Sequence, residues 1–190
     1  MGYEGGRTNL DLVESRALVR KAYGLLSETK ESIEAKGLNV EVVSCGGTTS
    51  YKEAAEFPGV TEVQAGTYVL MDTYHHRFTP EFEFALSVLA RVISVPRPGR
   101  AIADAGGTAI STDAGLPIVK GRDDLRVEKV HAEHALLKAD DNSRYPVVGE
   151  TLELLPTNID TTTCLHDEYI LVQVGEVLAT LNIAARGRFR

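Results

Sequence analysis

The apolar positions along the first third of the chain predict one long helix followed by short strands. Residues 9–36 carry leucine, valine and alanine at helical spacing, with Thr8 or Asn9 as the helix cap. The positions on this apolar face are Leu10, Val13, Ala17, Leu18, Leu25 and Leu26. Residues 39–44 then form a valine-rich strand, and a second strand begins at residues 61–64. This order of elements is typical of an α/β unit.

The pattern changes at Thr79 and Pro80, after which short apolar stretches alternate with turns. The strands expected in this part lie within residues 82–95, 100–104, 108–111, 126–131, 135–138, 151–155, 169–174 and 178–183. Many short strands with turns between them predict a β-sandwich or a small barrel. The chain is therefore expected to divide into a partial α/β domain, residues 1–78, and a β-rich domain, residues 79–190.

The α/β part has only two or three expected strands, which is too few for a complete domain of this class. A parallel sheet of that size would leave an open edge and an uncovered face. We therefore expect this part to be a fragment of a larger fold, or to require a partner.

Composition limits the classes of protein to which the chain can belong. The 190 residues are 43% hydrophobic and 25% charged, which is ordinary for a globular protein, and the net charge of −7 argues against binding to nucleic acid. We expect no membrane span, because no apolar run approaches ~20 residues. Cys45 and Cys164 form neither a metal-type pair nor a disulfide framework, so a reducing cytoplasm is the expected location.

Two glycine turns at strand ends are the strongest candidates for chemistry. Gly46, Gly47 and Thr48 follow the first strand, and Gly66 and Thr67 follow the second. Glycine lets backbone N–H groups approach an anion, and a threonine hydroxyl adds a further donor, so the pair predicts a phosphate cradle. The alternatives are a tight strand-to-helix connection at the first turn and a bulge or bend at Gly66.

A series of short motifs, in order along the chain, resembles a known family. The motifs are Gly2–Gly5, Val43–Thr49, Val60–Asp72, Asp104–Gly106, Glu133-His134, Val148–Glu150, Leu154–Pro156, His166-Asp167 and Ala185–Gly187. Together they resemble the C-terminal half of the D-threonine aldolase / D-serine dehydratase-like family. Its members are fold-type III pyridoxal phosphate enzymes related to alanine racemase.

The resemblance implies a fold, a cofactor and a set of cofactor-binding residues. It implies that residues 1–78 supply the last strands and helices of a TIM-like α/β barrel, followed by the β-rich domain. The pyridoxal phosphate would be held through its phosphate by Gly46, Gly47, Thr48, Gly66 and Thr67. The family's Schiff-base lysine lies upstream of anything matched here, and Lys52 is expected to be a solvated helix residue. The catalytic residue is therefore unknown, with His134 as a candidate and a structural or surface histidine as the alternative.

The resemblance also implies a divalent metal ion near the substrate hydroxyl. Asp160 matches one ligand position of the family motif, and Asn158 stands where the family has a histidine. If this segment is a strand, both side chains point to the same face. An amide oxygen is a poor ligand for zinc and a tolerable one for magnesium or manganese, so the metal could be any of the three. The alternative is a polar turn. Gly6 is a second departure, at another usual histidine position.

The resemblance predicts the C-terminal part of a metal-assisted, pyridoxal phosphate-dependent lyase. Its substrate would be a D-3-hydroxy amino acid, its reaction of the D-threonine aldolase or the D-serine dehydratase type, and its assembly a homodimer. Without the lysine, the chain alone is expected to be inactive. The alternatives are a non-catalytic phosphate-binding remnant of the fold and a truncated gene product without activity.

Overall fold

The computed structural model describes residues 1–5, 12–140 and 144–188. The helix cap expected at Thr8 or Asn9 lies outside these residues. The chain packs as two compact units, which are described separately below. The first comprises Met1–Val69 with His75–Glu83, and the second comprises Leu70–Tyr74 with Phe84–Arg190. None of the helices in the described ranges is both long and apolar enough to cross a membrane.

The first unit has the order of elements that the sequence predicts. Helix α1 (Leu12–Glu34) is followed by strand β1 (Ser44–Cys45), a 3₁₀ turn (Thr48–Ser50) and helix α2 (Tyr51–Glu56). Strand β2 (Glu62–Val63) then pairs with β1 in parallel and leads into a second 3₁₀ turn (Thr67–Val69). Both strands are shorter than the sequence suggests, and β1 begins only at Ser44, although the N–H groups of Thr61 and Glu62 donate to the Val43 carbonyl.

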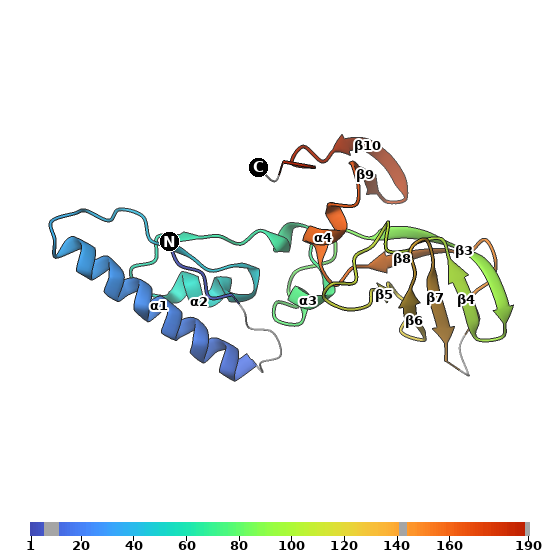
Figure 1. Cartoon of the computed structure of the whole chain (residues 1–190), viewed down its shortest axis with the longest axis horizontal. Helices are drawn as coiled ribbons and strands as arrows, with labels where there is room; N and C mark the ends of the chain where they lie inside the picture. The colour runs from blue at the N-terminus through green and yellow to red at the C-terminus, as the bar shows by residue number, and fades with distance from the viewer. Residues whose placement is uncertain (6–11, 141–143, 189–190) are drawn as a thin grey trace. The chain divides into compact units, whose positions relative to one another are not determined.

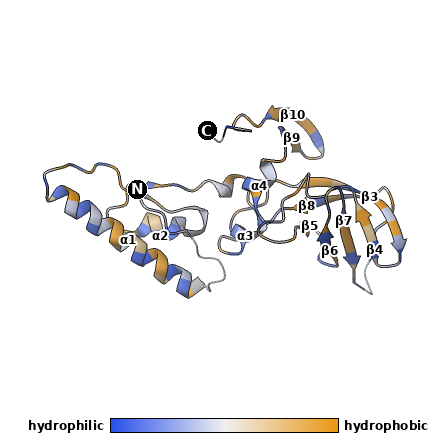
Figure 2. Ribbon diagram, viewed as in Figure 1, coloured by the Kyte–Doolittle hydropathy of each residue, from blue (hydrophilic) through white to orange (hydrophobic). Residues whose placement is uncertain are grey.

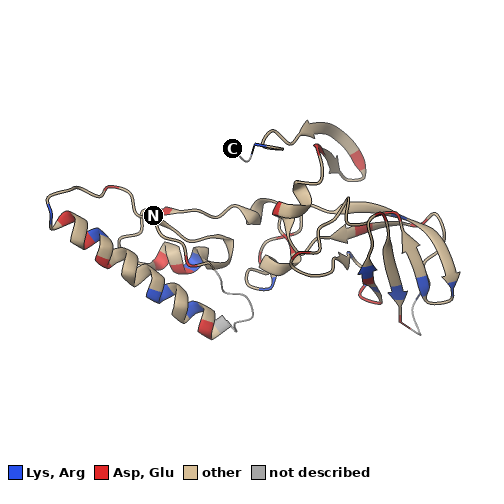
Figure 3. Cartoon of the chain, viewed as in Figure 1, with Lys and Arg blue, Asp and Glu red and all other residues tan. Residues whose placement is uncertain are grey.

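The core of this unit is small. Val19 and Tyr23 of α1 pack with Cys45 of β1 and Ala54 of α2, and all four side chains are almost fully buried. The Tyr23 ring meets the Phe57 ring edge-on, with centroids 5.5 Å apart. Much of the apolar surface of α1 stays exposed, and the mixture of apolar and polar positions along the helix is visible in Figure 2. Basic and acidic residues are also spread along α1 (Figure 3).

The second unit is built on a closed six-stranded barrel with neighbouring strands in the order β3-β4-β7-β6-β5-β8, and all its pairs are antiparallel (Figure 1). The strands are β3 (Val88–Arg97), β4 (Arg100–Ala103), β5 (Ile118–Val119), β6 (Leu125–Val130), β7 (Ala135–Ala139) and β8 (Thr151–Leu155). Closure leaves no strand of the barrel with an open edge. The sequence-based choice between a sandwich and a small barrel is thereby settled in favour of the barrel.

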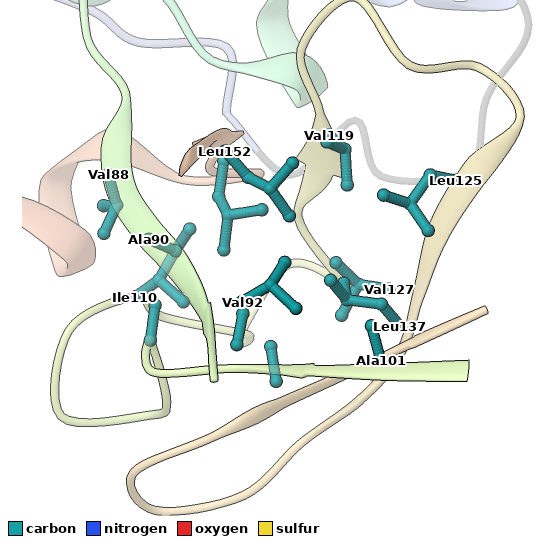
Figure 4. Close-up of a cluster of buried hydrophobic side chains, with 14 of the residues drawn as sticks. Val88, Ala90, Val92, Ala101, Ile110, Val119, Leu125, Val127, Leu137 and Leu152 are labelled. Carbon is teal, nitrogen blue, oxygen red and sulfur yellow. The ribbon is translucent and has the colours of Figure 1, made fainter. Parts of the chain in front are cut away.

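Alternating side chains fill the inside of the barrel. Along β7 the buried residues Ala135, Leu137 and Ala139 alternate with partly exposed ones. Figure 4 shows Val92, Leu137 and other apolar side chains from different strands pointing toward one another. This continuous core lies inside the closed sheet formed by β3 to β8.

The rest of the second unit consists of short elements. Helix α3 (Thr73–His76) contributes only Thr73 and Tyr74 to this unit, and helix α4 (Ile159–Thr163) follows β8. Strands β9 (Glu168–Gln173) and β10 (Glu176–Asn182) then form a separate antiparallel hairpin. Many apolar side chains of the hairpin are exposed, including Leu178 at 54%.

Most expected strands of the β-rich part are confirmed, and the strand expected at residues 108–111 is wrong. That segment is a turn, because the N–H groups of Ala109 and Ile110 both donate to the carbonyl of Gly106, each over 2.9 Å. The sequence also missed β5, which is only two residues long, and helix α4. The expected TIM-like portion is represented by one pair of parallel strands.

Candidate functional site

The two glycine turns lie at the carboxyl ends of two adjacent parallel strands. β1 runs into Gly46 and β2 runs toward Gly66, and the Gln64 N–H donates to the Cys45 carbonyl over 3.1 Å. In barrels and open sheets with parallel strands, binding groups gather at this edge, since the loops that follow neighbouring strands meet there. The structure therefore brings together the two turns that the sequence singled out.

A direct hydrogen bond joins the two turns. The backbone N–H of Tyr68 donates to Oγ1 of Thr48 over 3.1 Å, and Thr48 is only 4% exposed. The Thr48 hydroxyl can still donate its own proton, because a hydroxyl is at once a donor and an acceptor. Thr48 thus fixes the spacing of the turns and retains one proton for a ligand.

Gly46 is required by packing. Its φ is +80°, and a Cβ at this position would lie 2.9 Å from Cβ of Ala54 and 3.2 Å from Oη of Tyr23. Any larger residue would meet both a left-handed backbone and a steric clash. The simpler interpretation of this glycine, a tight strand-to-helix connection, is sufficient to explain it.

The N–H of Gly47 is engaged inside the protein. It donates to Oγ of Ser50 over 3.0 Å, and the Ser50 hydroxyl in turn donates to the carboxylate of Glu4. Glu4 and Ser50 are both buried. This chain of hydrogen bonds stabilises the first turn. Because the Gly47 N–H donates to Ser50, it is not available to a ligand.

Gly66 differs from the glycines of the first turn. It is exposed, its φ is not positive, and no atom lies within 4 Å of the place a Cβ would occupy. No neighbouring atom therefore requires a glycine at this position. Within the described parts of the chain, the N–H groups of Gly66 and Thr67 make no hydrogen bond. These two N–H groups are therefore available to an anion.

The side chains beneath the first turn stay uncharged at neutral pH. Burial raises the pKa of the Tyr23 phenol, and it raises the pKa of the Cys45 thiol, with Glu4 adding to both effects. A buried thiol whose pKa is raised is a poor nucleophile. The first turn therefore packs on the uncharged side chains of Tyr23 and Cys45 and on the carboxylate of Glu4, and none of these is a reactive nucleophile.

Lys52 is held in its protonated form. Its Nζ lies 2.6 Å from Oε1 of Glu81, which also accepts a hydrogen bond from the Tyr51 hydroxyl over 2.8 Å. The hydrogen bond with Glu81 raises the pKa of Lys52, while the hydrogen bond with Lys52 lowers the pKa of Glu81 to about 2. A lysine that forms an imine must be neutral when it attacks. The environment of Lys52 therefore agrees with the expected solvated residue.

His134 lies on an exposed turn between β6 and β7. Its carbonyl accepts the N–H of His131 over 2.8 Å, which closes the turn. Gly106 packs directly against this turn, since a Cβ there would lie 2.3 Å from the carbonyl oxygen of Ala132. The described contacts of His134 connect it to none of the other candidate residues. Gly6, the other departure from the family pattern, lies outside the described residues.

Asn158 and Asp160 lie at the start of helix α4, and the strand expected for this segment is wrong. Asn158 is the N-cap residue, and its Oδ1 accepts the N–H of Asp160 over 2.9 Å. Asn158 Nδ2 donates to Oδ2 of Asp113 over 3.2 Å. The two residues are brought close together by a helix cap, and Asp160 itself is exposed.

The sequence did not single out two carboxylates that hold this segment. Asp72 is fully buried, and its Oδ2 accepts the N–H of Ile159 over 3.2 Å. Asp113 Oδ1 accepts the hydroxyls of Ser111, over 2.8 Å, and Thr161, over 3.0 Å. A Ser-Thr-Asp sequence is a typical turn signal, and it was the available clue to Asp113. Asp72 is the last residue of the motif Val60–Asp72, but that motif does not indicate its partner, which is 87 residues away.

Comparisons with known proteins support the resemblance. Residues 85–172 match the family model described as "Putative serine dehydratase domain". A 3-hydroxy-D-aspartate aldolase of Paracoccus denitrificans is 35% identical, over 98% of this chain and 50% of that protein. The crystal structure of D-threonine aldolase from Filomicrobium marinum superposes with a TM-score of 0.88 at 31% identity, over 94% of this chain and 50% of that one.

The chain belongs to the D-threonine aldolase / D-serine dehydratase-like family. It spans about half the length of the curated relatives it matches, and corresponds to their C-terminal part. An alanine racemase-like protein from Idiomarina loihiensis superposes with a TM-score of 0.80 at 22% identity, over 95% of this chain and 54% of that one. This likeness shows a shared fold, and it confirms the expected relation to alanine racemase at that level.

Proposed function

We propose that this chain forms the C-terminal part of a pyridoxal phosphate-dependent lyase acting on D-3-hydroxy amino acids, of the aldolase or the dehydratase type. Gly66, Thr67 and Thr48 would hold the cofactor phosphate, and Gly46 and Gly47 would shape the turn beside it. The observation that carries the proposal is the pair of turns at the ends of parallel strands, joined through Thr48 and open at Gly66.

The residues present fit a phosphate group. Two N–H groups without a partner in the described structure, together with one hydroxyl proton, are the donors that a phosphate binds. Open space over Gly66 leaves room for an ester oxygen. When bound, pyridoxal phosphate supplies an electron sink, which accepts the electron pair left when a bond to the carbon bearing the amino group is cleaved. The contribution of this chain is to bind and orient the cofactor from its phosphate end, while the lysine would come from outside the matched residues.

The described residues do not fit the zinc, manganese or magnesium ion that the resemblance implies. Both ends of the Asn158 amide are engaged in hydrogen bonds. Within the described residues, no three His, Cys, Asp or Glu side chains come close enough together to hold a metal ion. The proposed function therefore includes no metal-dependent step.

A pair of ligands that differ only in the phosphate tests the proposed site. Pyridoxine 5′-phosphate lacks the aldehyde and forms no imine with surface lysines, and pyridoxine lacks the phosphate as well. We expect calorimetry to show binding of the phosphate ester at least about tenfold tighter than binding of pyridoxine, a difference of roughly 1.4 kcal/mol. Equal affinity for the two compounds would contradict the proposal.

A matched pair of variants locates the binding. Gly66→Ala places a methyl group over the open turn, and Gly107→Ala adds the same group in the barrel unit, where its nearest neighbour would be 3.7 Å away. Only Gly66→Ala is expected to weaken binding of pyridoxine 5′-phosphate. Equal loss in both variants would mean that the ligand binds elsewhere.

A non-catalytic ligand-binding remnant of the fold is the second candidate function. The closed hydrogen bonding of Asn158 favours it. The two candidates differ in one result. A protein that includes the upstream half of the family fold would cleave or dehydrate a D-3-hydroxy amino acid in the first case, and would only bind the cofactor in the second.

The assembly is a further part of the proposal. The family resemblance implies a homodimer, and sedimentation equilibrium of the chain would test it directly. We propose no nucleic-acid or membrane partner, in keeping with the net charge of −7.

A further inference from the structure

The start of helix α4 is held in a network of hydrogen bonds centred on Asn158 and Asp113. Asn158 Oδ1 accepts the N–H of Asp160 over 2.9 Å, and its Nδ2 donates to Asp113 Oδ2 over 3.2 Å. The other carboxylate oxygen of Asp113 accepts the hydroxyls of Ser111 and Thr161. The segment before β5 is thereby tied to the start of α4 through Asn158 and Thr161.

The orientation of the Asn158 amide is fixed by its two neighbours. With oxygen and nitrogen exchanged, the NH₂ group would face the N–H of Asp160, and the oxygen would face the carboxylate of Asp113. Both contacts would then be repulsive, donor against donor and acceptor against acceptor. The oxygen of the amide therefore points into the first turn of the helix.

This arrangement leaves Asn158 a weak metal ligand, because a cation would compete with the N–H of Asp160 for the amide oxygen. Only the amide oxygen carries lone pairs for a cation, and that oxygen already receives a hydrogen bond. Both oxygens of Asp113 also have donors. In the described chain, no three His, Cys, Asp or Glu side chains are grouped to hold an ion.

We infer that the start of α4 is a closed hydrogen-bonded lock in which Asn158 holds Asp113 in place of a metal ion, and that a histidine at position 158 would convert it into a divalent-metal site. Histidine would present a ring nitrogen with a free lone pair, a strong ligand for zinc and manganese. The exposed carboxylate of Asp160 would supply the second ligand from two residues further on. The inference does not depend on the proposed cofactor site, since metal binding is measured without activity.

Calorimetric titration of the full chain with Zn²⁺ and with Mn²⁺ tests the inference on the protein as it is. For the unaltered chain, we expect the Asp160→Ala substitution to leave any binding of either ion unchanged. Asn158→His is expected to gain at least about tenfold in affinity for Zn²⁺. The double variant Asn158→His with Asp160→Ala should lose this gain, which separates the new site from adventitious binding at the five histidines of the chain.

Two results would overturn the inference. The first is tight binding of Zn²⁺ or Mn²⁺ by the unaltered chain that Asp160→Ala abolishes, which would show that the lock opens to a metal. The second is a folded Asn158→His variant, with an unchanged circular dichroism spectrum, that gains no affinity. That result would show that Asn158 is not what keeps the metal out. The first measurement needs no variant of Asn158 to fold.

Discussion

The barrel and the α/β unit differ in how completely they bury a hydrophobic core. The barrel closes six strands around fifteen buried residues and leaves no open edge among those strands. The α/β unit has a two-stranded sheet and four buried core residues, while Val13 and Leu25 of α1 remain 77% and 56% exposed. The barrel is complete as a packed structure, whereas the unit that carries the proposed phosphate site is not.

Stability and the proposed chemistry reside in different parts of this chain. Inside the barrel, glycines and apolar residues are set by packing, so substitutions there are expected to lower the free energy of unfolding. At the turns of the α/β unit, packing constrains Gly46 tightly and Gly66 not at all. Substitutions at the open positions should therefore change ligand binding while leaving stability unchanged.

The largest expected effect comes from the barrel core. Leu154→Ala removes a fully buried side chain, and we expect it to lower the free energy of unfolding by about 2–5 kcal/mol. Leu25→Ala, on the exposed side of α1, is expected to change it by less than about 0.5 kcal/mol. Urea denaturation followed by circular dichroism measures both. Similar losses in the two variants would mean that the barrel core and the exposed side of α1 contribute equally to stability, which would contradict this account.

Glycine substitutions provide the next contrast. A Cβ at Gly106 would lie 2.4 Å from the backbone N of His134, so Gly106→Ala is expected to cost about 1–3 kcal/mol of unfolding free energy. Gly66→Ala meets no atom within 4 Å and is expected to leave stability unchanged. The same denaturation experiment applies. An unchanged stability in Gly106→Ala would mean that the turn at residues 131–134 yields without cost.

A smaller effect is expected at the contact between the two turns. Thr48→Val removes the acceptor of the Tyr68 N–H, and we expect it to cost about 0.5–1.5 kcal/mol and to weaken binding of pyridoxine 5′-phosphate. Thr48→Ser keeps the hydroxyl and serves as the control. If Thr48→Ser behaves like Thr48→Val, the methyl group of Thr48 matters and the hydrogen bond does not.

The smallest expected effect concerns the exposed pair of Glu81 and Lys52. The folded-state pKa of Glu81 is about 2, below its ordinary value of 4.5, because Lys52 and Tyr51 bond to the charged carboxylate. The pair therefore contributes above about pH 4.5, and its contribution is lost as the pH falls toward 2. Solvent screening keeps it small. Carbon-detected NMR titration of Glu81 measures the midpoint, and a midpoint near 4.5 would show that the pair does not form.

Sequence patterns anticipated the elements whose signals are local. The strand at residues 151–155 alternates clearly, and β8 spans Thr151–Leu155. Lys52, expected to be a helix residue, lies in helix α2. The patterns failed where distant contacts decide the structure. The turn at Gly106 depends on residues 131–134, and β5 exists only because β6 and β8 flank it.

The candidate site shows the same limit. The sequence picked out both glycine turns, because glycine after a short strand is a local signal. It could not show that the Gly47 N–H is engaged, because this depends on the hydrogen bonds of Ser50 and Glu4. It also could not show that Gly66 is open, because this depends on the absence of atoms within 4 Å of a Cβ there. It left a strand and a polar turn open for Asn158 and did not predict the helix cap, because the partner of Asn158, Asp113, lies 45 residues away in the chain.

One measurement tests the central claim directly. In ¹⁵N–¹H correlation spectra of the chain, titration with pyridoxine 5′-phosphate should shift the amide resonances of Gly66 and Thr67 strongly downfield, as expected for N–H groups that bind an anion. The Gly47 amide, which donates to Ser50, should shift much less. Titration with pyridoxine should leave all three unchanged. Strong shifts confined to other parts of the chain, with Gly66 and Thr67 unmoved, would contradict the proposed phosphate site.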